Sequence, residues 1–504
     1  MKKALKVFGN ILICILIVFS FLAFNSAGWY LQKYGDVGFD AILFTLFSNT
    51  AGVEQGLIRS YLACTIPITI LFSSIIIFLL FYNAKNKLVL YIRKFKICIF
   101  PFKRIFSKLF AVILSLIILL VTANNIKVFE FIDGKTNPSL FYEENYVDPE
   151  NVKITFPENK RNLIYIFIES METTYFSVEE GGAIKTNVVP ELYSLANENI
   201  NFSNNNGVGG AYVLPGATWT IAATVAQTAG ITLNLPVKDG NSLGKNREFM
   251  PNLYGITDIL HNNGYYQSFM CGSDADFGSR RQYYLDHGVD KIFDYYTAMD
   301  DGIIAKDFHD GWWGISDYDL YDYAKQELPK IASKNKPFAF FMLTVDTHHL
   351  EGNVCPKCDN KYAEQYENVF SCASKQMGDF INWAKSQDFY VNTTFVIVGD
   401  HNSMNMEYVS RNVYDGYDRM LYNAYINSAI STEFSKNREF SQVDFFPTTL
   451  AALGCEIDGD ALGLGVNLFS GKKTLAEEYG IQYFSVEIMK KSKLYNNKFL
   501  DMRY

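Results

Sequence analysis

The sequence lacks an excess of positive charge, internal repeats and low-complexity tracts. Its 504 residues contain 45 Lys and Arg against 53 Asp and Glu, and its second half has no basic stripe interleaved with aromatic residues. A nucleic-acid partner is therefore not expected, because such partners are bound through clustered positive charge. The eight cysteines are scattered along the chain, which excludes a small domain held together by disulfides. The length allows a membrane segment and one large folded domain.

Long apolar runs are present near the start of the chain. Residues 8–24 are almost uninterruptedly apolar and follow a lysine-rich beginning, a pattern that a cleaved signal peptide also shows. Two further apolar segments, Leu62–Tyr82 and Phe106–Thr122, are about long enough to cross a bilayer. We therefore expect a transmembrane anchor of three spans over residues 1–127 rather than a leader that is removed.

Basic residues are distributed unevenly between the two connections of this predicted anchor. The connection over residues 29–61 holds only two of them, whereas the connection over residues 83–108 holds eight: Lys85, Lys87, Arg93, Lys94, Lys96, Lys103, Arg104 and Lys108. Positively charged loops stay on the cytoplasmic side, so this second connection and the N-terminus are expected there. Three spans then place the rest of the chain outside. The sequence predicts a multi-pass protein of the cell membrane with an extracytoplasmic catalytic domain.

The remaining chain divides into a polar stretch and one long folded part. Residues 128–160 turn polar and lose hydrophobic periodicity, which indicates a linker near the membrane surface. Over residues 161–504, strand-like runs alternate with helical patterns, and this alternation predicts an α/β domain with a central, mostly parallel sheet flanked by helices. The expected strands are Leu163–Ile168, Tyr265–Cys271, Phe338–Thr344 and Phe395–Val398.

Polar side chains follow two of these runs at the point where each strand ends. The stretch FVIVGDHNS, residues 395–403, begins as a buried strand, turns at Gly399 and presents Asp400 and His401. The stretch LIYIFIES ends in the same way on Glu169. Carboxylates and imidazoles are good ligands for a divalent metal, and ligands of open α/β sheets bind at the carboxyl ends of strands. A solvated turn is the alternative for Asp400 and His401 alone, but two such strands favour a metal site.

Three further groups fall at predicted strand or helix ends. The helix pattern TWTIAATVAQTAG begins with threonines and is expected to stop at Gly230. Thr218 or Thr220 at its start is either a helix cap, which is the better interpretation when the motif is taken alone, or a neighbour of an anion bound there. The run TVDTHHLEG places His348 after a strand, and Arg280 follows the second expected strand. An arginine fork matches phosphate oxygens. A metal that activates a hydroxyl, together with a positive group on a phosphate, predicts phosphoryl transfer.

The chain resembles the alkaline-phosphatase-like superfamily, which includes the sulfatases, in the order and spacing of five motifs: LIYIFIES, GATWTIAATVAQTAG, LTVDTHH, VIVGDH and VDFFPTTLAALG. More narrowly, residues from about 160 to 475 are similar to the membrane-anchored phosphoglycerol transferases, which comprise lipoteichoic acid synthase and phosphoglycerol transferase I. The segments WTIAATVAQTAG and GLGVNLFSGKKTLAEEYG favour the second of these branches.

The resemblance implies a metal site and a nucleophile. Glu169, Asp400 and His401 match the metal ligands of the family, and Thr220, which follows GATW, matches the nucleophilic threonine that is itself a ligand. Thr218 stands where the family usually has glycine and is the alternative nucleophile. The implied cofactor is one divalent metal ion, with Mn²⁺ as the first choice and Mg²⁺ or Zn²⁺ as alternatives.

The resemblance also implies two residues that bind the substrate. Arg280 matches the arginine that contacts the phosphate, and His348 matches the histidine near the glycerol phosphate. Two residues before that arginine, lipoteichoic acid synthase has a tryptophan where this chain has Gly278, so the headgroup pocket differs. We interpret Trp312 and Trp313, in GWWGISD, as packing residues, with a place in the lining of the pocket as the alternative.

The implied function is metal-dependent transfer of a glycerophosphate group from phosphatidylglycerol to a surface glycan or polymer. The transfer would pass through a covalent intermediate on Thr220 and release diacylglycerol. The alternatives are phosphoethanolamine transfer, phosphodiester hydrolysis by water, and a catalytically inactive surface-binding protein. Sulfatase activity is not expected, because the C/S-x-P-x-R motif that supplies the sulfatase nucleophile is absent from the sequence.

Three cysteines, Cys355, Cys358 and Cys372, lie close together in the sequence. They suggest a zinc site, but no clear fourth ligand stands nearby, so an extracytoplasmic disulfide between two of them is favoured. Which two pair is left open by the sequence. Cys271 and Cys455 fall in apolar surroundings and are expected in the core.

Overall fold

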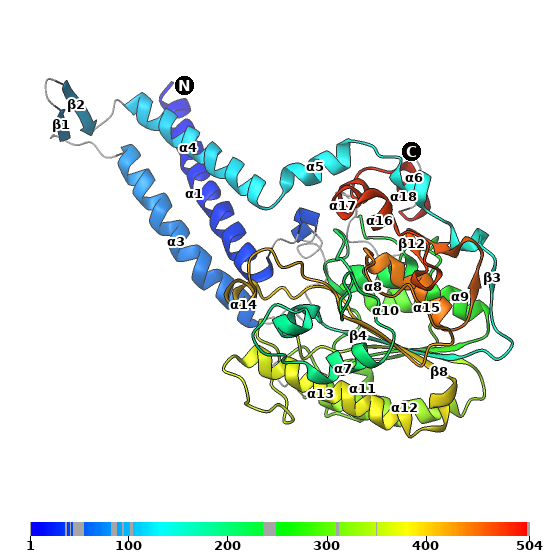
Figure 1. Cartoon of the computed structure of the whole chain (residues 1–504). Helices are drawn as coiled ribbons and strands as arrows, with labels where there is room; N and C mark the ends of the chain where they lie inside the picture. The colour runs from blue at the N-terminus through cyan, green and yellow to red at the C-terminus, as the bar shows by residue number, and fades with distance from the viewer. Residues whose placement is uncertain are drawn as a thin grey trace. The chain divides into compact units, whose positions relative to one another are not determined.

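The computed structural model describes residues 2–35, 38–40, 42–43, 55–81, 88–92, 95–100, 104–234, 248–308, 312–348 and 350–500. The chain forms two compact units. One comprises residues 1–36 and 53–130, and the other comprises residues 37–52 and 131–504 (Figure 1).

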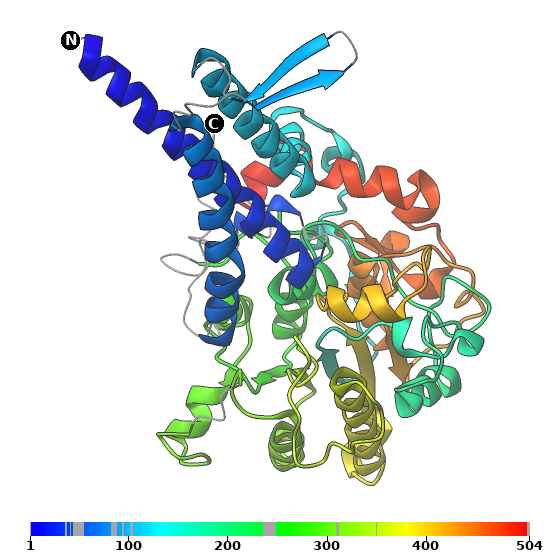
Figure 2. The same ribbon diagram turned by 90° about the vertical axis from the view of Figure 1, so that its left-hand side faces the viewer.

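Three long apolar helices build the first unit. The helix α1 (Lys2–Tyr34) packs against both α3 (Gln55–Phe81) and α4 (Arg104–Asn125). Polar side chains also join α1 to α3, since the Asn25 amide donates a hydrogen bond of 3.0 Å to the Thr69 hydroxyl. Such bonds hold helices together where the surroundings are apolar. Between α3 and α4, the strands β1 (Leu88–Ile92) and β2 (Phe95–Phe100) form an antiparallel hairpin (Figure 2).

Each of these helices is long and apolar enough to cross a membrane. The candidate spans are Ala4–Tyr34, Ile58–Phe81 and Ser107–Asn125. Few of their side chains are buried in the structure although they are apolar, which suits a lipid environment. The three helices predicted from the sequence are therefore present.

The second unit alternates strands and helices. Its strands are β3 (Ile154–Thr155), β4 (Asn162–Ile168), β5 (Tyr266–Cys271), β6 (Lys291–Phe293), β7 (Phe338–Leu343), β8 (Thr393–Gly399), β9 (Asn423–Ile426), β10 (Glu456–Ile457), β11 (Ala461–Leu462) and β12 (Gly465–Val466). The helix α5 (Val128–Thr136) begins just before this unit. The helices that follow it are α6 (Phe141–Asn145), α7 (Pro190–Glu198), α8 (Thr220–Ala229), α9 (Ile256–Asn262), α10 (Arg280–Asp286), α11 (Tyr295–Asp300), α12 (Asp317–Ala332), α13 (Gln365–Lys385), α14 (Met406–Asn412), α15 (Phe445–Ala452), α16 (Leu475–Tyr479), α17 (Ile481–Ile488) and α18 (Lys493–Lys498).

A six-stranded sheet in the order β6-β5-β7-β4-β8-β9 is the centre of this unit. All neighbouring pairs are parallel except β8 and β9, so the predicted α/β fold with a mostly parallel sheet is confirmed. The four expected strands are present as β4, β5, β7 and β8. The two edge strands, β6 and β9, have only three and four residues, too few to show a pattern in the sequence.

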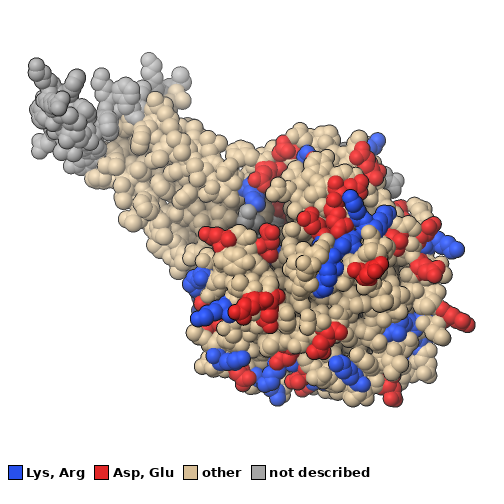
Figure 3. All heavy atoms as spheres, in the orientation of Figure 1, with Lys and Arg blue, Asp and Glu red and all other residues tan. Residues whose placement is uncertain are grey.

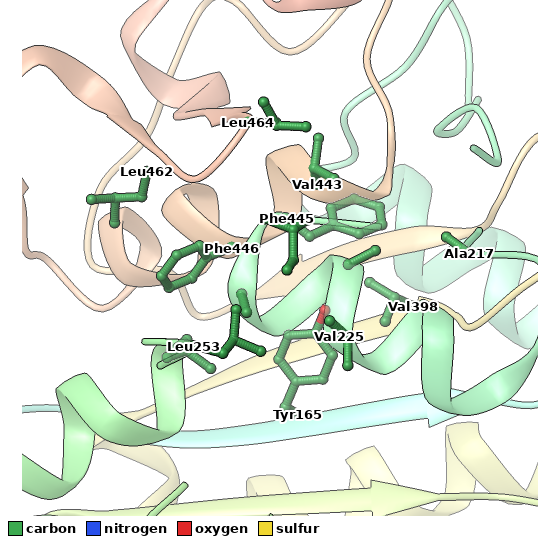
Figure 4. Packing of buried hydrophobic residues seen from close by; sticks show 14 of the residues in the cluster. Tyr165, Ala217, Val225, Leu253, Val398, Val443, Phe445, Phe446, Leu462 and Leu464 are labelled. Carbon is green, nitrogen blue, oxygen red and sulfur yellow. The ribbon is translucent and has the colours of Figure 1, made fainter. Parts of the chain in front are cut away.

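Alternating side chains of β4 enter two separate cores. Tyr165 and Phe167 pack with α8, α9, α10 and α15, whereas Ile164 and Ile166 pack with α7, α11, α12 and α13 on the opposite face. Figure 4 shows Tyr165 below Val225 of α8, close to Val398 of β8. Burial on both faces explains why these strands are continuously apolar. It also fixes the sheet rigidly, so the residues at its carboxyl edge have defined positions.

Residues 128–160, predicted to be a linker, contain α5, α6 and β3 in the structure. The strand β3 pairs with β10, and the buried ring of Tyr142 lies 5.0 Å from that of Tyr495. The segment from α6 onward is thus part of the second unit and packs within it. Its role as the connection between an anchor and a catalytic domain remains a prediction.

A buried pair of carboxyl groups holds the chain where it leaves β7. The oxygens of Asp317 accept hydrogen bonds from the backbone N–H groups of Val345 (2.7 Å) and Asp346 (3.0 Å), and Asp346 accepts one from the Asp317 N–H (3.1 Å). Burial raises the pKa of Asp317 to about 7. Burial, followed by the charge of Asp317, raises the pKa of Asp346 well above its usual range.

These raised pKa values predict a pH dependence of stability. Because the folded chain binds both protons more tightly, the pair contributes stability that is complete at about pH 4 and is lost as the pH rises through about 7. We expect Asp346→Asn to reduce the fall in melting temperature between about pH 5 and about pH 8. The amide of Asn353, which now donates to Asp346, can turn to accept from the new amide. Thermal unfolding measures this effect, and Asp379→Asn, at an exposed position of α13, is the control. Equal pH profiles for Asp346→Asn and the wild type would contradict the assignment.

Candidate active site

Adjacent strands bring Glu169, Asp400 and His401 together at the carboxyl edge of the sheet. In the register of β4 and β8, Ile168 lies opposite Gly399, so the residues that follow each strand are neighbours. One ligand atom from each of the three side chains lies within 4.8 Å of the others, and all three residues are buried. The His401 Nε2 atom is 3.4 Å from a Glu169 oxygen and 3.3 Å from Asp400 Oδ2.

The hydrogen bonds of Asp400 and His401 leave one atom of each side chain available to a ligand of this cluster. Asp400 Oδ1 accepts from the backbone N–H groups of Ser170 (2.8 Å) and His401 (2.7 Å), whereas Asp400 Oδ2 is buried and has no hydrogen-bond partner in the described residues. His401 Nδ1 lies 2.9 Å from the Asn402 carbonyl, which fixes the proton on Nδ1 and leaves Nε2 as an acceptor. The donor set, one imidazole and two carboxylates, fits a divalent cation.

The electrostatics of the cluster also favour a cation. Burial, followed by the charge of Glu169, raises the pKa of Asp400 to about 7. Burial lowers the pKa of His401, but the carboxylates of Asp400 and Glu169 outweigh this effect and raise it overall. Negative charges this close together in a buried place are costly unless a positive charge lies among them.

Thr220 is the hydroxyl next to this cluster. Its Oγ1 lies 3.4 Å from Glu169 Oε2, and Thr220 is the first residue of α8. The predicted threonine cap is wrong, because the helix is preceded by Trp219 in an extended conformation and no side chain caps it. The predicted glycine stop is confirmed at Gly230, whose φ is 68°. Thr218 lies in the turn before the helix. The free N–H groups and the positive end of the α8 dipole therefore face the same place as the Thr220 hydroxyl.

Two buried glutamines join α8 and the end of β8, and sequence reasoning missed both. The Gln227 amide donates to the carbonyls of Gly399 (3.0 Å) and Asp400 (3.1 Å). The Gln442 amide donates to the carbonyls of Asp400 (2.8 Å) and Ala217 (2.9 Å). They hold the helix start and the strand end in one register. A glutamine inside the apolar run TIAATVAQTA was the signal that would have found Gln227, because a buried amide needs partners.

A buried ion pair fixes the loop that follows His401. Glu172 accepts hydrogen bonds from Arg419 Nε (2.7 Å) and from the Ser403 N–H (3.0 Å). Arg419 also donates to the Ser403 carbonyl at 2.7 Å. Both backbone groups of Ser403 are thereby held by one charged pair. Neither member was predicted, since no local pattern marks them.

Arg419→Ala is expected to lower the free energy of unfolding by about 3–5 kcal/mol, because it leaves the fully buried Glu172 carboxylate without its positive partner. Chemical or thermal unfolding of the purified protein measures this loss. Arg411→Ala is the matched control, since Arg411 makes its ion pairs with Glu364 and Glu407 at the surface and its removal should change stability little. Similar losses in the two variants would contradict the role of the Glu172–Arg419 pair.

Arg280 lies in a turn that packs against the start of α8. Its Nη2 donates to Ser273 Oγ (3.1 Å) and to the Asp274 carbonyl (2.7 Å), and its buried Nε has no hydrogen-bond partner among the described residues. Gly278, in the short helix η4 (Phe277–Ser279), has a φ of 66°. A Cβ atom at Gly278 would lie 3.5 Å from Ile221 Cγ2, so this turn reaches the residue next to Thr220.

Aromatic rings connect the Arg280 turn to His348. The guanidinium carbon of Arg280 is 5.7 Å from the centre of the Phe277 ring, which is 5.2 Å from the ring of Trp313. Trp313 is in turn 4.8 Å from His348, and Trp312 is 6.5 Å from it. The two tryptophans do pack, as predicted, but they pack on His348, one of the predicted substrate-binding residues. They are therefore candidates for the lining of a substrate pocket as well.

Comparison with known proteins places this geometry in a family. The Sulfatase family model matches residues 161–455. Phosphoglycerol transferase I from Escherichia fergusonii is 31% identical over 279 residues, which are 54% of this chain and 34% of that protein. The match thus spans about a third of the length of this relative.

Solved structures with a similar fold include two bacterial proteins. One is the lipoteichoic acid synthase LtaP from Listeria monocytogenes, with a TM-score of 0.49 and 19% identity over 64% of this chain and 79% of that one. The other is a protein of the alkaline phosphatase superfamily from Vibrio parahaemolyticus, with a TM-score of 0.47 and 21% identity over 64% of this chain and 74% of that one. The Sulfatase match covers more than half of the present sequence and confirms the resemblance of the motifs, and the chain belongs to the Sulfatase family.

Proposed function

We propose that this protein transfers a glycerophosphate group from phosphatidylglycerol to a surface glycan or polymer and releases diacylglycerol. The observation that carries the proposal is the Thr220 hydroxyl, which stands at a helix start 3.4 Å from Glu169 in a buried cluster with Asp400 and His401. The relative named phosphoglycerol transferase I supports this choice among phosphoryl-transfer reactions. The sequence has no C/S-x-P-x-R motif, which argues against sulfate ester hydrolysis.

The cofactor that we propose is one divalent metal ion held by Glu169, Asp400, His401 and Thr220, with Mn²⁺ as the first choice and Mg²⁺ or Zn²⁺ as alternatives. The unpartnered Asp400 Oδ2 and the acceptor His401 Nε2 are the atoms available for it. When bound, such an ion lowers the pKa of a hydroxyl and neutralises charge on a phosphate.

Each residue of the proposed site has its own role in the reaction. Thr220 Oγ loses its proton and forms a bond to phosphorus, while the bond from phosphorus to the diacylglycerol oxygen breaks and that oxygen takes up a proton. The N–H groups at the start of α8 and the Arg280 guanidinium bind the charged phosphate oxygens. In the second half, an acceptor hydroxyl attacks the same phosphorus and frees Thr220. His348, whose ring packs against Trp313, is the residue that we propose to contact the glycerol phosphate.

The proposed location is the cell membrane, with a multi-pass anchor over residues 1–127, a linker over 128–160 and an extracytoplasmic catalytic domain over 161–504. The three apolar helices and the basic connection over residues 83–108 support this orientation. The donor lipid would then lie in the outer leaflet. On the face seen in Figure 3, the charged side chains of the second unit alternate in sign, without a broad basic field. This agrees with uncharged or mixed-charge glycan acceptors rather than with a nucleic acid.

The test is release of diacylglycerol from labelled phospholipids by the purified full chain with Mn²⁺. We expect release from phosphatidylglycerol and none from phosphatidylethanolamine or from an aryl sulfate. Release from phosphatidylethanolamine alone would reassign the protein to phosphoethanolamine transfer. Production of free glycerophosphate at the same rate, whatever acceptor is added, would reassign it to hydrolysis. No turnover of any of these compounds would favour a catalytically inactive binding protein.

A further inference from the structure

Three thiols meet on the side of the second unit where the loop after β7 returns to α13. Cys355 Sγ lies 3.6 Å from both Cys358 Sγ and Cys372 Sγ, and all three cysteines are free. The disulfide predicted from the sequence is therefore wrong for this structure. Cys355 and Cys358 bracket a tight turn, closed by a hydrogen bond of 3.0 Å from the Cys358 N–H to the Cys355 carbonyl, and Cys372 reaches this turn from α13. The three sulfur atoms consequently converge instead of forming one pair.

We propose that Cys355, Cys358 and Cys372 form a second metal site, which binds one Zn²⁺ ion as thiolates. Four ligands arranged tetrahedrally with bonds of about 2.3 Å place their sulfur atoms about 3.8 Å apart. The two sulfur–sulfur distances of 3.6 Å lie close to this value. A disulfide needs a distance of about 2.05 Å. Sulfur is also the ligand that selects zinc over the hard cations Mg²⁺ and Mn²⁺.

The surroundings of the sulfur atoms are those of thiolates that hold a metal. The Lys357 N–H donates to Cys355 Sγ at 3.4 Å, within the turn Cys355–Cys358. The Gln376 amide donates to Cys372 Sγ at 3.2 Å and reaches Cys355 Sγ at 3.9 Å. N–H groups directed at sulfur stabilise its negative form, and their role here is otherwise unexplained. Cys355 and Cys372 are each only 4% exposed, so water offers their sulfur atoms little alternative contact.

The fourth position of this site faces outward. In the part of the chain that the structure describes, no fourth histidine, cysteine or carboxylate joins the three thiols. Cys358 is only half-buried, which places the open side of the cluster next to solvent. A water molecule fills such a position in many zinc sites with three protein ligands. Binding of the ion displaces the three thiol protons to solvent, so no oxidant is needed.

A metal ion at this site would link the loop that contains His348 to the core of the second unit. Cys355 and Cys358 belong to this loop, whereas Cys372 lies in α13, whose Phe370 and Met377 are part of the core under the sheet. The Gly352 N–H donates to the His348 carbonyl at 3.1 Å, so the segment between His348 and the thiols is short and internally bonded. A metal at the thiols therefore restrains the chain that leads to His348. This inference does not depend on the proposed reaction.

Binding of Co²⁺ tests the proposed thiol site. Co²⁺ bound by thiolates absorbs in the near ultraviolet through charge transfer from sulfur, whereas Co²⁺ bound only by oxygen and nitrogen does not. We expect the purified, reduced full chain to develop this absorption and to saturate it with one equivalent at the thiol cluster. Zn²⁺ should then displace it. Cys355→Ser and Cys358→Ser should each weaken the absorption, because fewer thiolates then bind the cobalt ion. Cys271→Ser, which removes a buried thiol outside the cluster, should leave it unchanged.

A second measurement does not rely on folding of the cysteine variants. Asp400→Asn removes a ligand from the other cluster, so zinc that remains bound to this variant at one ion per chain reports the thiol site. The proposal is overturned if the reduced wild-type chain shows no thiolate-to-cobalt absorption. It is also overturned if the mass of the untreated chain is lower by two hydrogen atoms and a disulfide joins two of these cysteines while no zinc is bound. Failure of phosphatidylglycerol turnover, by contrast, would leave these results unchanged.

Discussion

Thr220→Ala is expected to abolish diacylglycerol release from phosphatidylglycerol, with a loss of at least about 10⁴-fold, the scale on which removal of a catalytic nucleophile acts. The physical reason is that Thr220 carries the hydroxyl that lies 3.4 Å from Glu169 at the start of α8. Alanine is an excellent helix former, and the Thr220 hydroxyl does not cap the helix, so the fold should not suffer. The measurement is release of labelled diacylglycerol with Mn²⁺, together with a melting curve for each protein.

Thr218→Ala is the matched control for this prediction. Thr218 lies two residues earlier, in the turn before Trp219, and should lose little activity when its hydroxyl is removed. Thr220→Ser, which keeps a hydroxyl on the same helix position, should retain a measurable part of the rate. An inactive Thr218→Ala beside an active Thr220→Ala would transfer the nucleophile to Thr218. Full activity of Thr220→Ala and Thr218→Ala alike would exclude a threonine nucleophile.

Asp400→Asn is expected to remove the divalent ion bound at the cluster of Glu169, Asp400 and His401 and, with it, the transfer activity, while metal at the thiol cluster is retained. Oδ1 can keep its two hydrogen bonds from backbone N–H groups in asparagine, but the unpartnered Oδ2 becomes an amide that cannot bind a cation. The variant should therefore fold. Added Mn²⁺ at about 100 times the dissociation constant should stabilise the wild type by about 2.7 kcal/mol, and this stabilisation should vanish in Asp400→Asn.

Metal content and the melting temperature with and without Mn²⁺ measure this effect. Gln227→Glu provides a contrasting variant, since Gln227 contacts the backbone of Asp400 and not the ligand atoms. It should weaken metal binding without abolishing it. Unchanged metal content and activity in Asp400→Asn would show that the cluster of Glu169, Asp400 and His401 is not the metal site.

The ends of the central strands could be predicted from the sequence because their signals are local. Continuous apolar runs marked β4 and β8, and the residues that follow each run, Glu169 and Asp400–His401, needed only the rule that parallel strands end at one edge. The glycine stop of α8 was equally local. The adjacency of β4 and β8 itself, which brings the two ends together, comes from the packing of the whole sheet.

The supporting residues could not be predicted because their partners are distant in the chain. Glu172 and Arg419 are 247 positions apart, and Gln442 is 225 positions from Ala217, whose carbonyl it binds. No sequence pattern around any of these residues indicates its distant partner. The segment VDFFPTTLAALG has the sequence pattern of a strand followed by a helix, but its residues form the end of the short helix η6 (Gln442–Asp444) and α15. There Asp444 forms a capping box with Ser441, which favours a helical turn where a strand was expected.

The cysteines also show which arrangements could and could not be predicted from the sequence. The buried positions of Cys271 and Cys455 followed correctly from their apolar surroundings. The disulfide was predicted because the outside of the cell is oxidising. That argument does not consider how the three sulfur atoms are arranged. Only the turn at Cys355 and the direction of α13 reveal that all three thiols converge.

Mass spectrometry of the peptide that contains Thr220 tests the central claim most directly. The purified chain would be mixed with phosphatidylglycerol and Mn²⁺ without any acceptor and then quenched in acid. We predict that the Thr220 peptide gains the mass of one glycerophosphoryl group, on Thr220 itself, and that this adduct disappears when an acceptor glycan is added. Turnover of the lipid with the Thr220 peptide unmodified at every time point would contradict a covalent intermediate on this residue.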